Sequence, residues 1–179
     1  MEVVELGPGH AEALQRFFAG LPEGDLTFIE EEVTDPAVVR SWAEGAGGGR
    51  RFVALDGGEV AGYVAVRRLP GWSSHVGEVR LVVSPDRRGS GLGRTLARQA
   101  LVAAVGDGLA KLVVEVVAEQ GAALALFSGL GFTGEALLRD HVRDREGTLR
   151  DLMVLAHHVD DTWSGMATVG LDEVLGDPS

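Results

Sequence analysis

The sequence predicts an α/β (α+β) fold, and two observations carry this prediction. Short runs rich in apolar and β-branched residues alternate along the chain with segments whose apolar residues recur at helical spacing. In addition, an apolar strand at residues 75–83 leads through a proline turn and a Gly-rich loop directly into an amphipathic helix that begins at Leu92. The length of 179 residues suits one domain with a substantial core.

The N-terminal half is expected to form a strand, two helices, a β-hairpin and a further strand. Asp35-Pro36 has the form of an N-cap followed by proline at the first helical position, so it begins the second helix. Asp56-Gly57-Gly58 separates two β-rich runs and predicts the hairpin turn. In chain order the expected elements are 3–6, 9–19, 35 to the glycine cluster 45–49, 51–55, 59–68 and 75–83.

The C-terminal half is expected to contain two helices and three strands. The helix from Leu92 ends at Gly106-Asp107-Gly108, because two glycines flank the aspartate. The run 112–117 is almost continuously apolar, which predicts a strand buried on both faces. A short apolar helix closed by Gly131 and a terminal hairpin follow, at 122–130, 132–143 and 148–156.

The Gly-rich loop is typical of an anion site. Glycines 89, 91 and 93 allow positive φ angles and close approach, so backbone N–H groups can converge on one anion at the start of a helix. Arg87, Arg88, Arg94 and Arg98 concentrate positive charge in a chain whose net charge is −11. The simpler alternative is a solvated basic turn. The spacing excludes the Walker A loop and the dinucleotide pattern G-x-G-x-x-G, since glycine and lysine are missing where those motifs need them.

The spacing Arg88-x-x-Gly91-x-Gly93, directly after a strand that ends in Val-Val-Ser-Pro, resembles the signature of the GNAT superfamily of acyl-CoA-dependent N-acyltransferases. The segment 123–132 and the terminal hairpin, with Leu138 to Asp144, are also similar to that family. The resemblance spans about residues 3–157. It implies a GNAT fold with a central mixed, mostly antiparallel β-sheet flanked by helices, and a domain at 1–158. The C-terminal extension at 159–179 lies outside the resemblance. Its Trp163 and aliphatic residues favour a short helix that covers the domain or a partner subunit over a disordered tail.

The resemblance implies acetyl-CoA as the co-substrate. The loop would hold its pyrophosphate, the backbone of 81–83 would pair with the pantetheine arm, and the Val83 amide would stabilise the oxyanion. The residues expected to bind acetyl-CoA are Leu81, Val82, Val83, Arg88, Gly89, Ser90, Gly91, Leu92, Gly93, Arg94, Gln120 and Phe127.

The candidate base is Glu78, which lies in an apolar strand on the same face as Arg80 and Val82. An ion pair between Glu78 and Arg80 in a half-exposed strand is an equally good interpretation. Phe127 stands where the family often has a tyrosine that acts as the acid; since Phe127 cannot donate a proton, a role as a core aromatic is favoured. His75 and His141 are weaker candidates for proton transfer.

The acceptor site is expected in the acidic segment 26–32, between the first two helices. Its candidate residues are Phe28, Glu30 and Glu31, together with His141, and they would attract an amine with an apolar body. A solvated acidic loop is at least as good an interpretation of any single glutamate. His157-His158 with Asp160-Asp161 has a loose metal-ligand composition, but a strand end is favoured and no metal is expected.

Composition bears on the location of the protein and on the class of partner that it binds. The chain has no cysteine, and we expect a cytoplasmic protein because it shows neither a signal-peptide pattern nor an apolar run long enough to cross a membrane. The net charge of −11 argues against a nucleic-acid partner and is compatible with an amine substrate. The sequence is also compatible with a homodimer. The predicted function is transfer of an acetyl group from acetyl-CoA to a primary amine, and the alternative is a non-catalytic acyl-CoA-binding sensor.

Overall fold

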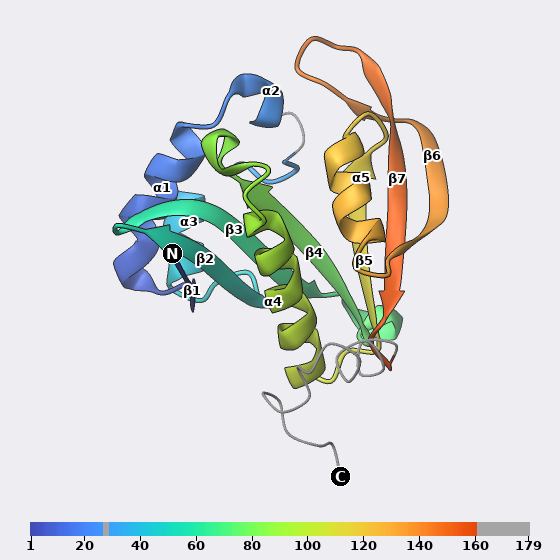
Figure 1. Cartoon of the computed structure of the whole chain (residues 1–179), viewed down its shortest axis with the longest axis horizontal. Helices are drawn as coiled ribbons and strands as arrows, with labels where there is room; N and C mark the ends of the chain where they lie inside the picture. Colours follow the sequence, from blue (N-terminus) through green and yellow to red (C-terminus); the bar gives the residue numbers. More distant parts are fainter. Residues whose placement is uncertain (27–28, 161–179) are drawn as a thin grey trace.

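A seven-stranded mixed sheet, in the order β1-β2-β3-β4-β5-β7-β6, forms the centre of the protein (Figure 1). The structure is a computed structural model that describes residues 1–26 and 29–160. β4 and β5 run parallel, whereas the other neighbours in this sheet are antiparallel. The strands are β1 (Glu2–Glu5), β2 (Arg50–Asp56), β3 (Glu59–Arg68), β4 (Val76–Val83), β5 (Lys111–Val117), β6 (Thr133–Arg143) and β7 (Leu149–His158).

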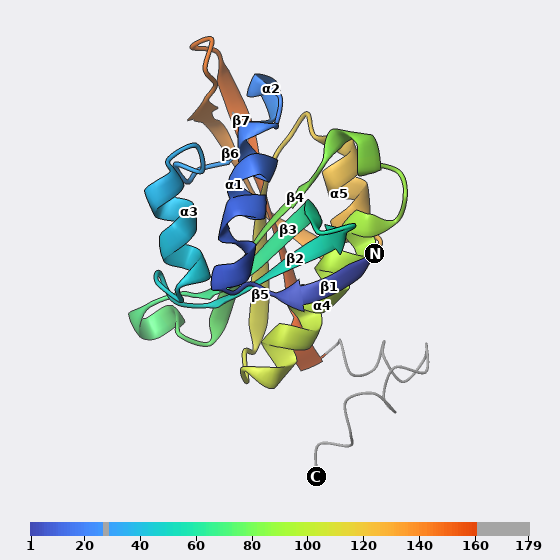
Figure 2. The same ribbon diagram turned by 90° about the vertical axis from the view of Figure 1, so that its left-hand side faces the viewer.

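Helices cover both faces of the sheet, as Figure 2 shows. On one face Leu14 and Phe18 of α1 and Val39 of α3 pack on side chains of β2 and β3. On the other face Leu96 and Ala100 of α4 pack on the sheet, and α5 adds Phe127 to this second core. The helices are α1 (Ala11–Ala19), α2 (Glu23–Leu26), α3 (Pro36–Ala43), α4 (Leu92–Gly106) and α5 (Gly121–Ser128), with 3-10 turns at Pro8–His10, Gly71–Ser73 and Pro85–Arg87. This layered arrangement confirms the predicted fold class.

Two local predictions are confirmed in detail. The Asp35 carboxylate accepts the N–H of Ala37 at 2.8 Å, so it caps α3 while Pro36 occupies the first helical position. Gly57 and Gly58 have φ angles of 61° and 90°, which is the conformation of a two-residue hairpin turn between β2 and β3.

The structure differs from the expectations in three places. The four-residue helix α2 (Glu23–Leu26) was not predicted, because a single helical turn leaves no periodic pattern to detect. The prediction that β5 is buried on both faces is wrong at Glu115, which is exposed. Val159, which the sequence places in the extension, is 5% exposed in the core, and its N–H donates to the Ala110 carbonyl. Residues 161–179 of that extension lie outside the described part of the chain.

Within residues 1–26 and 29–160, the structure contains no helix with the length and apolar character needed to cross a membrane.

Candidate functional site

β4 and β5 are paired over only part of their length. The parallel register joins Val76–Val79 to residues 111–114, whereas β4 stays paired with β3 as far as Val83. Beyond Val79 and Val114 the two strands diverge, and the sheet splits at this end (Figure 1). Helix α2, the loop before α4 and the tip of the β6–β7 hairpin all lie at the same end, so the split is surrounded by loops.

The backbone of β4 presents hydrogen-bonding groups to this split. The Ser84 N–H donates to the Ala61 carbonyl of β3 at 3.0 Å. Because residues of an antiparallel ladder alternate between bonded and non-bonded positions, Val82 also faces β3, whereas the N–H and C=O of Leu81 and Val83 point to the opposite side. The Val83 carbonyl accepts from Arg88 Nη2 at 3.4 Å, which agrees with this orientation. Of the three positions predicted for pantetheine pairing, Leu81 and Val83, the latter also the predicted oxyanion donor, therefore direct backbone groups to the split, whereas the backbone of Val82 pairs with β3.

The predicted anion loop joins β4 to α4. Gly89 and Gly91 have φ angles of 75° and 87°, which favour glycine, and Gly91 is the N-cap of α4 without a side-chain cap. A Cβ on Gly93 would lie 3.3 Å from Leu126 of α5 and 3.6 Å from Val83 of β4. The glycine therefore allows the start of α4 to pack closely against both α5 and β4. The backbone N–H groups of the first turn of α4 are therefore suited to bind an anion.

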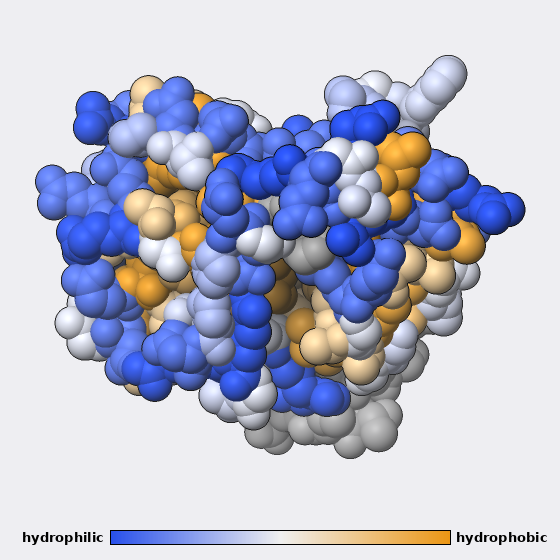
Figure 3. Space-filling view, turned by 90° about the horizontal axis from the view of Figure 1, so that it is seen from above, coloured by the Kyte–Doolittle hydropathy of each residue, from blue (hydrophilic) through white to orange (hydrophobic). Residues whose placement is uncertain are grey.

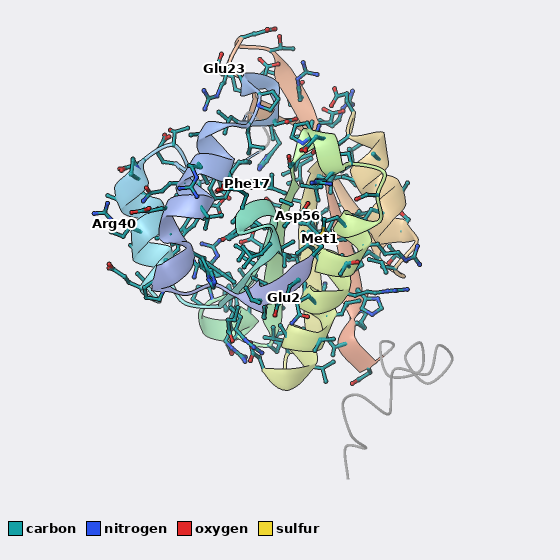
Figure 4. The ribbon with its side chains drawn as sticks, turned by 60° about the vertical axis from the view of Figure 1, so that its left-hand side comes forward. Met1, Glu2, Phe17, Glu23, Arg40 and Asp56 are labelled. Carbon is teal, nitrogen blue, oxygen red and sulfur yellow. The ribbon has the colours of Figure 1, made fainter. Side chains whose placement is uncertain are left out.

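The loop arginines are engaged by carboxylates. Arg88 Nη2 lies 2.7 Å from the Asp25 carboxylate of α2, and Arg87 pairs with Asp56 at the end of β2. Figure 4 shows Asp56 beside the loop and Glu23 at the outer end of α2. Arg94 donates to the Gly129 carbonyl at 3.4 Å, and the Ser90 hydroxyl donates to the Arg87 carbonyl at 2.6 Å. An anion in the loop would therefore compete with Asp25 for Arg88.

Four carboxylates gather around Arg80 on the other face of β4. Arg80 contacts Glu78 of β4, Glu115 of β5, and both Glu30 and Glu31 of the segment between α2 and α3. Carboxylate oxygens of Glu30, Glu78 and Glu115 lie within 4.8 Å of one another. We call these four glutamates the acidic cluster. A guanidinium in contact with every member makes the cluster a poor divalent-cation site, because the cation would meet Arg80.

Glu78, the predicted base, is held by two arginines. Its Oε1 lies 3.0 Å from Arg80 Nη2, and its Oε2 pairs with Arg67 of β3. The side chain is only 10% exposed, so the expectation of a half-exposed carboxylate is wrong, while the expected pairing with Arg80 is confirmed. Both oxygens of Glu78 are committed to ion pairs.

Glu115 is a functional candidate that the sequence reasoning missed. It is the first residue of β5 beyond the last pair with β4, its side chain is 36% exposed, and its Oε2 lies 3.4 Å from Arg80 Nη1. The signal in the sequence is a single glutamate within an apolar, β-branched run. Only the register of β4 and β5 brings that glutamate beside Arg80.

Other predicted residues have local structural roles. Phe127 is 3% exposed and packs edge-to-face on Phe132 with ring centroids 5.2 Å apart, which confirms the core-aromatic interpretation. The Gln120 side-chain oxygen accepts the Val117 N–H at 3.2 Å, at the N-cap of α5. Leu92 is 4% exposed in the core, so its backbone rather than its side chain is available to the loop.

The structure brings Glu30 and Glu31 to Arg80 but separates His141 and His75 from the acidic cluster. His141 lies exposed on the edge strand β6, where the pairing with β7 is interrupted between Leu138 and Val142. His75 is exposed and precedes β4 at the end away from the split. Phe28 lies outside the described residues. Seen from above, the end of the molecule with the split carries mostly hydrophilic side chains (Figure 3).

Comparison with known proteins gives a consistent picture. Residues 14–132 match the model of the "Acetyltransferase (GNAT) family". N-acetyltransferase 8F1 of Rattus norvegicus is 33% identical over 132 residues, which cover 70% of this chain and 58% of that protein. A mycothiol acetyltransferase of Amycolatopsis mediterranei is 34% identical over 124 residues, covering 66% of this chain and 40% of the relative. The chain thus spans less than two thirds of the length of either relative.

Solved structures with the same fold are also found. The ribosomal-protein-alanine N-acetyltransferase of Brucella melitensis has a TM-score of 0.79 at 23% identity, with 88% of this chain and 99% of that chain covered. A putative acetyltransferase of Salmonella typhimurium, solved with acetyl-CoA, has a TM-score of 0.78 at 21% identity, with 89% and 94% covered. These likenesses confirm the fold expected from the sequence.

Proposed function

Because the chain belongs to the GNAT acetyltransferase family, we propose that it transfers an acetyl group from acetyl-CoA to a primary amine by direct attack on the thioester. The observation that carries the proposal is the split between β4 and β5, flanked on one side by the glycine loop and on the other by the acidic cluster. One end of the sheet thus brings together groups that could bind an anionic donor and groups that could bind a cationic acceptor.

The residues of the loop fit acetyl-CoA, which supplies a thioester that is reactive toward a neutral amine. The N–H groups from Gly89 to Arg94 would bind the pyrophosphate, with Arg88 moving from Asp25 to a phosphate oxygen. Leu81 and Val83 would pair with the pantetheine amides as an added strand. The Val83 N–H would donate to the thioester oxygen and stabilise negative charge that develops there.

The acceptor must lose a proton before it can attack. An alkylammonium with an ordinary pKa near 10.4 costs about 4.6 kcal/mol to deprotonate at pH 7. We assign the proton acceptor to Glu115, acting directly or through a water, because it is exposed and has one ion pair at 3.4 Å. Glu78 is the weaker choice, since both of its oxygens already bind arginines and it is nearly buried.

Proton balance does not require a strong acid in the site. One N–C bond forms and one C–S bond breaks, and the nitrogen loses two protons between ammonium and amide. One proton passes through Glu115 to solvent, and the other restores the thiol. A thiol with an ordinary pKa near 8.5 lies only about 2 kcal/mol from balance at pH 7, so a water can supply its proton where Phe127 cannot.

The acidic cluster favours an acceptor that carries positive charge. Glu30 is 73% exposed at its side chain and Glu31 is 32% exposed, so both can reach an approaching ammonium group. We place the acceptor against these two glutamates and Glu115. The same charges would repel anionic acceptors.

A second function, a non-catalytic acyl-CoA-binding sensor, is favoured by one observation. Phe127 is buried against Phe132 and supplies no proton, which removes the acid that the family often uses. The two functions share the donor site and differ in turnover.

The test combines calorimetry with mass spectrometry. We expect acetyl-CoA to bind, and a panel of amines mixed with acetyl-CoA to yield an acetylated product with release of free thiol. Binding without turnover of any amine would favour the sensor. Failure to bind acetyl-CoA at millimolar concentration would overturn both functions.

A further inference from the structure

Arg80 stands at the point where the acidic cluster is assembled. It is the first residue of β4 beyond the last pair with β5, and its side chain is 18% exposed. Its Nη2 lies 3.0 Å from Glu78 Oε1, its Nη1 lies 3.4 Å from Glu115 Oε2, and its Nε lies 3.5 Å from Glu31 Oε1. Nη2 also pairs with Glu30. One guanidinium therefore links β4, β5 and the segment between α2 and α3.

Arg80 offsets part of the negative charge in this region. The acidic cluster contributes four negative charges, and the positive groups are Arg80 and, from β3, Arg67, which contacts Glu78 alone. The sum is −2 with Arg80 and −3 without it. Since oxygens of three of these carboxylates lie within 4.8 Å, removing the central cation would leave strong mutual repulsion.

The balance of forces keeps Arg80 charged. Burial acts to lower the pKa of Arg80, but the negative charges of Glu78, Glu31, Glu30 and Glu115 together raise it above its ordinary value. A lysine at this position would retain the positive charge. Its ammonium group would lack the planar guanidinium with which Arg80 contacts several carboxylates at once.

We propose that Arg80 is the positioning residue of the acceptor site: its guanidinium holds Glu115, Glu30 and Glu31 at the split, so that the Glu115 carboxylate is in place to take a proton from the acceptor. This inference rests on the proposed function. Arg80 does not touch the reacting atoms. It acts through Glu115, because its Nη1 lies 3.4 Å from Glu115 Oε2 and keeps that carboxylate beside the split.

The role differs from simple stabilisation in its dependence on Glu115. Arg80 holds Glu115 Oε2 at 3.4 Å, and without Arg80 this contact is lost. If Arg80 acts by positioning Glu115, its removal should lower turnover only while Glu115 is present. A purely structural arginine would change the amount of folded protein and would lower turnover whether or not Glu115 is present.

The experiment compares wild type with Arg80→Met, Arg80→Lys and a matched control, Arg16→Met, which removes the exposed ion pair between Arg16 of α1 and Glu59 of β3. Glu115→Gln is made alone and together with Arg80→Met. For each protein, calorimetry gives the affinity for acetyl-CoA, and kcat and KM are measured for an amine that the wild type acetylates. We expect unchanged acetyl-CoA affinity in all of these proteins. Arg80→Met should lose at least about tenfold in kcat/KM, and the double variant should lose no more than Glu115→Gln alone.

Arg80→Lys should recover part of the activity, because the charge is retained, and Arg16→Met should match wild type throughout. If Arg80→Met does not bind acetyl-CoA, the double variant Arg80→Met with Glu31→Gln, which carries one carboxylate fewer, provides the same measurement. Full activity in Arg80→Met, or a loss in the double variant of Arg80→Met with Glu115→Gln that exceeds that of Glu115→Gln alone, overturns the inference and leaves the proposed function standing. A wild-type protein that binds acetyl-CoA and acetylates no amine overturns both.

Discussion

Arg80 of β4 and Glu115 of β5 occupy the first positions beyond the last paired residues of the two strands, and their side chains meet at 3.4 Å where the backbones separate. An ion pair thus replaces the backbone ladder at the point where the sheet splits. The arrangement places a charged, exposed carboxylate beside strand edges that face the same opening. It favours Glu115 over Glu78, the base expected from the sequence, as the carboxylate that can reach an acceptor.

Glu115→Gln and Glu78→Gln should have different effects. If Glu115 takes the proton, Glu115→Gln should lower kcat by about 100-fold or more, with a small effect on thermal stability, because the side chain is partly exposed. Glu78→Gln should lower the unfolding temperature more, because it leaves Arg80 and Arg67 without their most buried partner. Initial rates and thermal unfolding of both variants check this. The reverse pattern, with turnover abolished only in the Glu78 variant, would return the base to Glu78.

Arg88→Ala should weaken acetyl-CoA binding by about tenfold or more, since it removes a charge-assisted hydrogen bond to a phosphate. The matched variant is Asp25→Asn, which removes the carboxylate that holds Arg88 at 2.7 Å in the structure. That variant should bind acetyl-CoA as tightly as wild type or more tightly, because Arg88 no longer has to leave a carboxylate. Titration calorimetry of the two variants decides the point. Equal affinity of Arg88→Ala and wild type would remove Arg88 from the donor site.

Gly49→Ala should destabilise the protein much more than Gly48→Ala. Both glycines have positive φ, 74° and 64°, so either alanine carries the backbone penalty of about 1–2 kcal/mol. At Gly49 the new Cβ would also lie 2.3 Å from the Val66 carbonyl oxygen of β3, whereas at Gly48 nothing lies within 4 Å. Urea unfolding of the two variants should therefore differ by more than about 1 kcal/mol. Equal urea midpoints of the two variants would show that the start of β2 can move away from β3 to make room for the new Cβ.

Asp144 should make stability depend on acidic pH. The hydrogen bond from Arg150, opposed by burial and assisted by the Thr148 and Glu146 N–H groups, lowers the pKa of Asp144 below its ordinary value. Because the folded pKa is the lower one, the unfolded state binds more protons in this range. The contribution of Asp144 is then full above about pH 4, the ordinary range of an aspartate, and is lost as pH falls through the lowered folded value.

Urea unfolding of wild type and Asp144→Asn at pH 7, 5 and 3 measures this contribution. The stability difference should be constant between pH 7 and 5 and smaller at pH 3. Asp140→Asn is the control, because in residues 1–26 and 29–160 the structure gives the Asp140 carboxylate no ion pair. A difference that persists unchanged to pH 3 would contradict the ionic role of Asp144.

The fold was largely predictable from local signals, and the site only in part. The Asp35-Pro36 cap, the Gly57-Gly58 turn and the Gly-rich loop each combine residue types that few other conformations accept, so the sequence indicates them directly. Glu115 gave no such signal, since a lone glutamate in an apolar strand is explained only by the early end of the β4–β5 pairing. The role of Arg80 depends on contacts with Glu30, fifty positions away in sequence, which no local pattern contains.

The strand order has a consequence for how the protein folds during synthesis. Among the strands of residues 1–26 and 29–160, β7 is made last, yet it lies between β5 and β6, so β5 has no antiparallel partner in this sheet until residues 149–158 are complete. β1 to β4 pair with strands that neighbour them along the chain, and they can assemble earlier. The strand that carries Glu115 therefore lacks its antiparallel partner until β7 has been synthesised, and a chain that stops before β7 leaves this edge of β5 open to aggregation.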